Sequence, residues 1–214
     1  MEQQLLTAGF APVAGVDEAG RGACCGPISI AACILPFDAH PDHPDQYVLP
    51  PELEGLNDSK KLSPKKRDNL YQALQEHARS YAVVMISAHD IDRWGLQHAN
   101  ISGMRRAVAL LDDEPGYVLT DAMKVPGLAQ PHLPVVKGDQ MAASIAAASI
   151  LAKVSRDRLM VELDQQYPGY GLAGHKGYGT KAHMDAVSLH GGTPHHRYTY
   201  SNVATAHAAW LSQQ

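Results

Sequence analysis

Residues 13 to 22 read Val13-Ala14-Gly15-Val16-Asp17-Glu18-Ala19-Gly20-Arg21-Gly22, and this stretch does most to decide the fold. A short apolar run ends in two adjacent carboxylates, and a glycine–arginine–glycine turn follows. Carboxylates are hard oxygen ligands for a hard divalent cation. Glycines allow backbone amides to approach a polyanion closely, and the planar guanidinium of Arg21 suits phosphate. The stretch therefore indicates a strand that leads into a site for metal-assisted phosphodiester chemistry.

Around this stretch, apolar strand-like runs alternate with helical segments. We expect strands over residues 13–17, 28–35, 82–86, 117–120 and 133–136, and helices over residues 64–79, 96–111, 141–163, 180–187 and 202–211. The first two strands are joined by the glycine turn and should pair. Residues 36–51, rich in proline, aspartate and histidine, are interpreted as a loop. The pattern predicts one α/β domain over residues 1–214, with a mixed sheet and a short helical C-terminal part.

Length and composition are those of an ordinary globular protein. The chain has 214 residues, 45% of them hydrophobic, and a net charge of −4 that argues against nonspecific polyanion binding by the whole surface. No apolar run approaches the ~18–20 residues that span a bilayer, and Met1–Gln4 lacks a basic signal-peptide region. A cytoplasmic location without membrane contact is expected. The cysteines Cys24, Cys25 and Cys33 are interpreted as small buried residues, and His195-His196 as a solvated loop.

Acidic residues follow three of the predicted strands, namely Asp17 with Glu18, Asp121, and Asp139. In open α/β sheets, sites gather beyond the carboxyl ends of the strands. Four carboxylates there would hold hard cations, and two metals ~3.5–4 Å apart can activate a water and stabilise a leaving oxygen.

Each acidic residue also has a structural explanation. Asp121 can be a turn residue, and Asp139 can cap the helix that follows it. Adjacent strand residues point to opposite faces, so Asp17 and Glu18 share a site only if the strand ends or bulges there. Asp157 is interpreted as a partner in a structural ion pair.

A second feature is a run of basic residues that consists of Lys60, Lys61, Lys65, Lys66 and Arg67. Ser63-Pro64 has the form of a helix N-cap followed by proline at the first helical position. Basic side chains there oppose the helix dipole, so a nearby nucleic-acid backbone would help. The alternative is a solvated helix face.

The chain resembles the type 2 ribonucleases H (ribonuclease HII) over nearly its whole length. The resemblance covers Gly15–Pro27, Leu56–Ser63, Val118–Asp121, Val136–Asp139, Ala146–Asp157 and His175–Thr180. It implies the ribonuclease H-like fold, an α/β fold with a mixed five-stranded sheet flanked by helices.

The resemblance also implies residue roles. The implied catalytic and metal-binding tetrad, for Mg²⁺ or Mn²⁺, is Asp17, Glu18, Asp121 and Asp139. The implied substrate-binding residues are Gly20, Arg21 and Gly22 at the ribonucleotide 2′-hydroxyl, Tyr178 against the adjoining sugar, and Asn57, Ser59, Lys60 and Lys61. The implied partners are RNA/DNA hybrids and ribonucleotide-containing DNA, cut by a monomer on the 5′ side of a ribonucleotide to leave 3′-hydroxyl and 5′-phosphate ends. Many bacterial members have glycine where this chain has Ala122, and Cys24-Cys25 replaces more usual apolar residues.

Three other functions compete with this one. Ribonuclease HIII carries an extra N-terminal domain, whereas only sixteen residues precede Asp17. A catalytically idle RNA/DNA-duplex binder would not need four carboxylates. A metal-dependent small-molecule phosphatase fits poorly with the lysine-rich run.

Overall fold

A computed structural model describes residues 1–56, 59 and 61–214. Asn57 and Lys60, two of the expected substrate-binding residues, lie outside the described residues. The chain falls into two compact units. The first unit comprises Met1–Glu18, Ile30–Val84 and Ile101–Val154, and the second unit comprises Ala19–Ser29, Met85–Asn100 and Ser155–Gln214. Each is described by itself.

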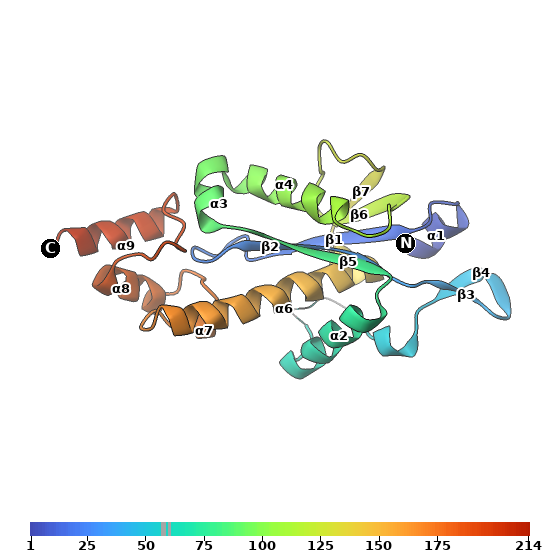
Figure 1. Cartoon of the computed structure of the whole chain (residues 1–214), viewed down its shortest axis with the longest axis horizontal. Coiled ribbons are helices and arrows are strands. Elements are labelled where there is room, and N and C mark those ends of the chain that lie inside the picture. The colour runs from blue at the N-terminus through green and yellow to red at the C-terminus, as the bar shows by residue number, and fades with distance from the viewer. Residues whose placement is uncertain (57–58, 60) are drawn as a thin grey trace. The chain divides into compact units, whose positions relative to one another are not determined.

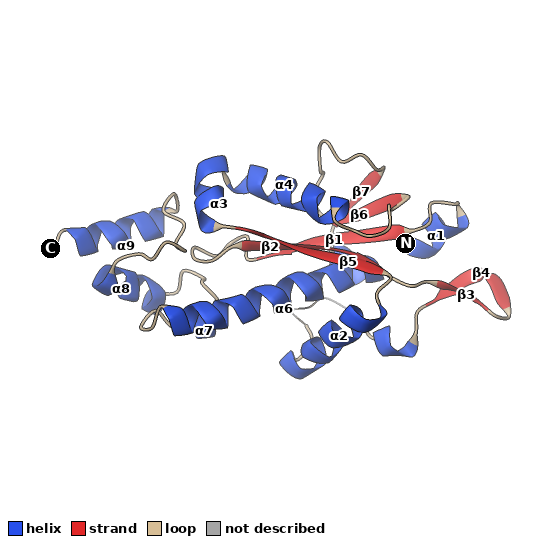
Figure 2. Ribbon diagram, in the orientation of Figure 1, coloured by secondary structure: helices blue, strands red, loops and turns tan. Residues whose placement is uncertain are grey.

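The described part of the chain begins with a short helix and four strands, continues with helices interleaved with β5, β6 and β7, and ends in a run of helices (Figures 1 and 2). The strands are β1 (Val13–Ala19), β2 (Ile28–Ile34), β3 (Asp38–His40), β4 (His43–Val48), β5 (Ser80–Ile86), β6 (Tyr117–Asp121) and β7 (His132–Val135). The helices are α1 (Glu2–Thr7), the 3₁₀ turn η1 (Pro51–Leu53), α2 (Pro64–His77), α3 (Ala88–Trp94), α4 (Leu96–Ala109), α5 (Gly138–Met141), α6 (Ala143–Gln166), α7 (Leu172–His175), α8 (Lys181–His190) and α9 (Ser201–Leu211).

The main sheet has five strands in the order β5-β2-β1-β6-β7, so β1 is central. This confirms the expected mixed five-stranded sheet and the neighbouring positions of β1 and β2. β6 runs parallel to β1 with Val16 opposite Thr120, and β7 runs parallel to β6 with Asp121 opposite Val135. The carboxyl ends of these three parallel strands therefore meet at one edge of the sheet.

Helix α6 packs on β1 with almost no space between the two backbones. A Cβ atom on Gly15 would lie 2.0 Å from the carbonyl carbon of Ser144. The alanines at positions 146–148, in the N-terminal half of α6, are fully or almost fully buried. In Figure 1, α6 and α2 lie on one side of the sheet and α4 lies on the other. Small residues on both β1 and α6 allow this approach, which fixes the strand that leads to Asp17.

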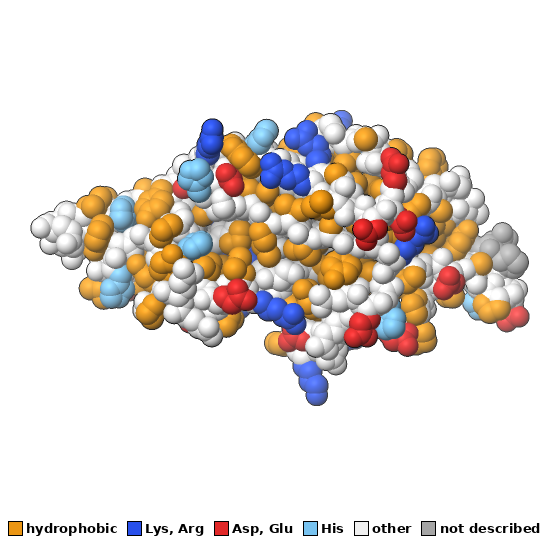
Figure 3. Space-filling model, in the orientation of Figure 1, with side chains coloured by type: hydrophobic (Ala, Val, Ile, Leu, Met, Phe, Trp, Pro, Cys, Tyr) orange, Lys and Arg blue, Asp and Glu red, His pale blue; other side chains and the backbone are white. Residues whose placement is uncertain are grey.

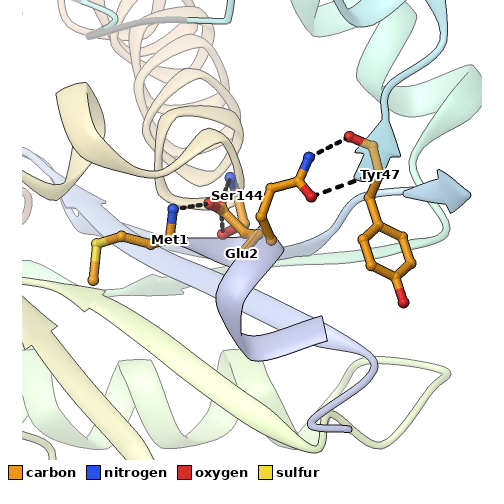
Figure 4. Close-up of polar contacts among 5 residues, drawn as sticks. Met1, Glu2, Tyr47 and Ser144 are labelled. Carbon is orange, nitrogen blue, oxygen red and sulfur yellow. Dashed lines mark hydrogen bonds and ion pairs between the residues drawn. The ribbon is translucent and has the colours of Figure 1, made fainter. Parts of the chain in front are cut away.

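The N-terminus of α6 is capped by a residue from the start of the chain (Figure 4). The Glu2 carboxylate is buried and accepts hydrogen bonds from the backbone N–H (2.8 Å) and the hydroxyl (2.9 Å) of Ser144. The next residue, Gln3, exchanges two hydrogen bonds with the backbone of Tyr47 in β4. A carboxylate at a helix N-terminus satisfies orphan N–H groups and complements the helix dipole. Helix α1 therefore joins the hairpin β3–β4 and α6.

The second unit has its own core, formed by Cys25, Met160, Leu163, Tyr170, Leu172, Val187 and Ala206. Helix α8 packs against α9, and the Thr180 hydroxyl caps α8 by accepting the N–H of His183 (3.2 Å). The three cysteines are free and buried, as expected. Among the described residues, no helix is both long and apolar enough to cross a membrane.

Most predicted elements are confirmed, with small shifts at their ends. The expected cap of α2 is present, because the Ser63 hydroxyl accepts the N–H of Lys66 (3.3 Å). The interpretation of residues 36–51 as a loop was wrong, because they contain the antiparallel hairpin β3–β4. The short helices α1, α3 and α7 were not predicted. The helix expected from about Met141 is α6, which begins at Ala143 because Ala142 has an extended backbone, and the separate short helix α5 before it was not predicted.

Candidate active site

Two carboxylates lie in the carboxyl-terminal parts of adjacent parallel strands. Val16 of β1 is opposite Thr120 of β6, so the residues that follow them, Asp17 and Asp121, lie on neighbouring strands. Strand β1 continues to Ala19, so of the two conditions that the sequence analysis gave for a shared site, an end or a bulge at Asp17, the first is not met. The charge of Glu18 nevertheless acts on the Asp17 carboxyl, as does that of Asp121. These three carboxylates share one electrostatic environment.

The Asp17 carboxyl is buried, at 6% exposure, and several groups fix its charge and orientation. Burial raises its pKa well above the usual range, and the charges of Glu18 and Asp121 raise it further. The backbone N–H of Glu18 (2.7 Å from Asp17 Oδ1) and the Ser149 hydroxyl oppose this by donating hydrogen bonds. A bound cation would relieve the same repulsion. Asp17 therefore has the properties of a metal ligand.

Ser149, on α6, is a site residue that the sequence analysis missed. Its hydroxyl contacts the hydroxyl of Ser59 (2.8 Å) as well as Asp17. Ser59, one of the expected substrate-binding residues, is only 1% exposed. The buried serine pair links the segment before α2 to Asp17, so Ser59 supports this carboxylate indirectly, through Ser149.

The loop after β7 brings the remaining acidic residue toward Asp121. The Asp121 carboxylate accepts the N–H of Gly138 (2.8 Å), and the next residue, Asp139, is buried in the first turn of α5. The cap position of α5 is Lys137, in the left-handed conformation, so Asp139 lies within the first turn of α5 and not at its cap. Ala122 also has a left-handed backbone, with φ of +50°. That conformation favours glycine, the residue that the family resemblance led us to expect at this position.

The four carboxylates are near one another without forming a tight cluster. Within the described residues, no three of them bring oxygen atoms within 4.8 Å of one another. Their all-oxygen chemistry and mutual repulsion fit a hard divalent cation such as Mg²⁺ or Mn²⁺. Asp157 lies on α6 in the second unit, where its negative charge acts on the Arg156 guanidinium, and its role in a structural ion pair stays a prediction.

In the second unit, the glycine–arginine–glycine turn lies beside Tyr178. A Cβ atom on Gly22 would lie 3.8 Å from Tyr178 Cε1, with nothing nearer, and the tyrosine side chain is 44% exposed. Gly20 differs, because its φ is +85° and a Cβ there would lie 1.9 Å from Arg156 Nε. Gly20 is therefore required by the fold, whereas the space in front of Gly22 and Tyr178 is open.

The basic run has two kinds of residue. Lys61 is exposed, but Arg67 donates to the backbone carbonyls of Ser59 (2.7 Å) and Leu62 (2.9 Å), so it stabilises the turn before α2. On the face drawn in Figure 3, basic side chains are scattered among acidic and apolar ones, and one group projects at the position of α2. Lys61 remains a candidate phosphate contact.

A buried cluster in the second unit contains Cys25, His183 and His196, whose ligand atoms lie within 4.8 Å of one another. Interpreting His196 as solvated was wrong, because it is 1% exposed. Its Nδ1 accepts the N–H of Thr193 (2.9 Å), which assigns the proton to Nε2. That proton is donated to His183 Nε2 (3.0 Å), and His183 Nδ1–H is donated to the Tyr178 carbonyl (2.9 Å).

These bonds form a one-way relay from Thr193 to Tyr178. The Nε2 lone pair of His183 is already used, and burial raises the pKa of Cys25 to about 12, which keeps the thiol protonated. The guanidinium groups of Arg156 and Arg197 are also close enough to act on that thiol. The cluster is therefore explained by hydrogen bonding that supports the Tyr178 segment.

Comparison with known families decides between the competing functions. The sequence model of the family described as Ribonuclease HII matches residues 14–203. The chain belongs to the ribonuclease HII family. A Ribonuclease HII of Corynebacterium jeikeium is 67% identical over 211 residues, 99% of this chain and 97% of that relative. One of Mycolicibacterium smegmatis is 53% identical over 206 residues, 96% of this chain and 72% of that relative.

Solved structures agree with this assignment to ribonuclease HII. The ribonuclease H2 of Pyrococcus horikoshii OT3 aligns with a TM-score of 0.76 and 26% identity over 93% of this chain and 98% of that one. A Bst ribonuclease HIII solved in complex with Mn²⁺ shares the fold, with a TM-score of 0.62 at 19% identity over 99% of this chain and 75% of that one. The protein is a ribonuclease H, a hydrolase with endonuclease activity.

Proposed function

We propose that this ribonuclease H cuts the RNA strand of RNA/DNA hybrids, and cuts 5′ to ribonucleotides embedded in duplex DNA. The proposed catalytic and metal-binding residues are Asp17, Glu18, Asp121 and Asp139. The observation that carries the proposal is the raised pKa of the buried Asp17 carboxyl beside Glu18 and Asp121, at the ends of parallel strands. Like charges held together in this way are typical of a site that a cation completes.

The proposed cofactor is Mg²⁺ or Mn²⁺. Bound divalent metal would supply an activated water and stabilise the leaving oxygen of the phosphodiester. The chain's own residues hold the ligands in place, since Ser149 donates to Asp17 and Gly138 N–H donates to Asp121. These hydrogen bonds orient the two carboxylates.

The proposed ribose-binding residues are Gly20, Arg21, Gly22 and Tyr178. The 2′-hydroxyl alone distinguishes the two sugars at a given site. The exposed space in front of Gly22 and the Tyr178 ring can accept a sugar, because nothing else lies within 4 Å of a Cβ at Gly22. Lys61, exposed before α2, is proposed to contact the phosphate backbone.

The tetrad is tested with Asp17→Asn. We expect this variant to lose nearly all cleavage of a duplex with one ribonucleotide, while it still binds the duplex. The matched control is Asp185→Asn, on an exposed carboxylate of α8 that pairs with Lys181 (2.7 Å). Cleavage by Asp17→Asn within a few-fold of the parent rate, in Mg²⁺ or Mn²⁺, would reject the assignment.

The ribose contact is tested with Gly22→Ala. The added methyl group meets only Tyr178 Cε1 at ordinary contact distance, so thermal stability should stay close to that of the parent. Cleavage at an embedded ribonucleotide should fall by at least tenfold, because the methyl group fills the space for the sugar. A folded Gly22→Ala variant with parental cleavage would show that the sugar binds elsewhere.

A further inference from the structure

Arg197 is a fully buried arginine between α8 and α9 whose five N–H donors are all used. Its Nε donates to the Gly26 carbonyl (3.2 Å). Its Nη1 donates to the Arg21 carbonyl (3.0 Å) and the Tyr200 hydroxyl (3.1 Å), and its Nη2 donates to the carbonyls of Gly20 (2.8 Å) and Gly26 (3.0 Å). A guanidinium has five N–H groups, so none is left for a carboxylate. Two of the five bonds go to the turn of Gly20, Arg21 and Gly22, two go to Gly26 shortly after it, and one goes to Tyr200.

A buried charge surrounded by neutral oxygens does little for stability compared with an apolar side chain of the same volume. What the guanidinium supplies here is geometry. It holds the carbonyls of Gly20 and Arg21 toward the protein interior. In a planar trans peptide the C=O and the following N–H point in opposite directions. The N–H groups of Arg21 and Gly22 are therefore directed away from Arg197, on a stretch where both residues are exposed.

The position of Arg197 is itself fixed by the backbone. The Arg197 N–H donates to the Cys24 carbonyl (2.9 Å), and the Gly26 N–H donates to the His195 carbonyl (2.8 Å). The Tyr200 hydroxyl also lies 3.2 Å from the Arg21 carbonyl, and the guanidinium lies 5.5 Å from the centre of the Tyr200 ring. These contacts connect the guanidinium to the turn at several points.

We propose that Arg197 is a positioning residue that sets the preference for ribose over deoxyribose, by directing the N–H groups of Arg21 and Gly22 toward the 2′-hydroxyl. The inference rests on the proposed function, in which this turn binds the sugar. Arg197 does not touch the substrate, and it acts through the two peptide groups whose carbonyls it holds. Tyr200 shares this role through its contact with the Arg21 carbonyl.

The experiment compares the affinities of each variant for two duplexes that differ only in one 2′-hydroxyl. Fluorescence anisotropy in Ca²⁺ measures the dissociation constants for a duplex with one ribonucleotide and for its all-deoxy counterpart. Unfolded protein weakens both constants alike, so the ratio reports on sugar recognition and not on stability. The variants are Arg197→Lys, which keeps the charge but loses the fork, and Tyr200→Phe, which removes one hydroxyl. The matched control is Tyr198→Phe, whose hydroxyl donates to the Thr193 carbonyl (3.2 Å).

We expect Arg197→Lys to lower the parental ratio by about tenfold, the size of one well-formed hydrogen bond. Tyr200→Phe should lower it two- to threefold, on the order of a weak hydrogen bond, and Tyr198→Phe should not change it. A parent that discriminates, together with an Arg197→Lys variant that keeps the parental ratio, would overturn the positioning role. If Arg197→Lys does not fold, an unchanged ratio in Tyr200→Phe overturns it. A parent without discrimination would instead reject the proposed sugar site, and the positioning role with it.

Discussion

The buried histidine His196 should make folding sensitive to mild acid. Burial, together with the neighbouring His183, lowers its pKa from 6.5 to about 4. The folded protein then holds a neutral ring whose Nδ1 accepts the Thr193 N–H, whereas the unfolded chain takes up a proton. A lowered pKa means that stability is fully present above pH 6.5, falls as the pH drops toward 4, and falls no further below that value.

The size of the effect follows from the two pKa values. The fall of the His196 pKa from 6.5 to about 4 corresponds to a loss of about 3 kcal/mol in the free energy of unfolding when the pH is below both values. At pH 5.5, where the unfolded ring is mostly protonated and the folded ring is not, the loss relative to pH 7.5 is about 1.4 kcal/mol. Protonation at Nδ1 also breaks the bond from Thr193, which begins the relay to the Tyr178 carbonyl.

Urea unfolding at 25 °C, at pH 7.5 and at pH 5.5, measures this loss. The quantity of interest is the difference between the two pH values, compared between the parent and His196→Asn. Other titrating groups, Asp17 among them, are present in both proteins and cancel. The variant should lose less stability on acidification than the parent, by about 1.4 kcal/mol. His98→Asn, on an exposed histidine, is the control and should behave as the parent does. Equal acid sensitivity in the parent and in His196→Asn would refute the reasoning.

Three further predictions concern the packing of α6, the phosphate contact and the sugar contact. Gly15→Ala should lower the free energy of unfolding by ~1–3 kcal/mol or more, because the new Cβ meets the α6 backbone. The control Gly174→Ala should leave the free energy of unfolding unchanged, because there is open space around Gly174. Thermal melting that is equal in both variants would contradict the close packing. Lys61→Ala should reduce the slope of log affinity against log salt by about 0.9 on hybrid and all-DNA duplexes alike. An unchanged slope would show that Lys61 does not contact the phosphate backbone. Tyr178→Ala should melt near the parental temperature, because the ring is 44% exposed, yet cut an embedded ribonucleotide much more slowly in single turnover. A destabilised variant with normal cleavage per folded molecule would contradict that role.

The parts of the fold that depend on local sequence could be predicted. Apolar runs predicted the five strands of the main sheet, and Ser63-Pro64 predicted the start of α2. The hairpin β3–β4 could not be predicted, because its proline-, aspartate- and histidine-rich sequence has a weak strand pattern. Its edge is held by Gln3, 44 residues from Tyr47 along the chain. A contact with a residue so far along the chain cannot be predicted from the local sequence pattern.

The candidate site shows the same division. Aspartates at strand ends could be placed from the order of strands, since parallel strands bring their carboxyl ends together. The supporting residues could not, because their roles come from tertiary contacts. Ser149 is one small residue among many in α6, and it is distinguished only by its contact with Asp17. His196 looks polar and solvated in the sequence, and it becomes buried only when α8 and the Cys25 segment pack around it.

The central position of β1 has a consequence for how the chain is made. One edge of β1 pairs with β2 early, but the other waits for β6, which begins 104 residues after Val13. At ribosomal rates of about 5–20 residues per second, that interval lasts roughly 5–20 seconds. During it, an apolar strand edge lies open beside a nascent chain, a situation that favours pairing with the wrong partner. Asp17 and Asp121 become neighbours only when β6 arrives, so a nascent chain cannot bring the proposed tetrad together before Asp121 and Asp139 have been synthesised.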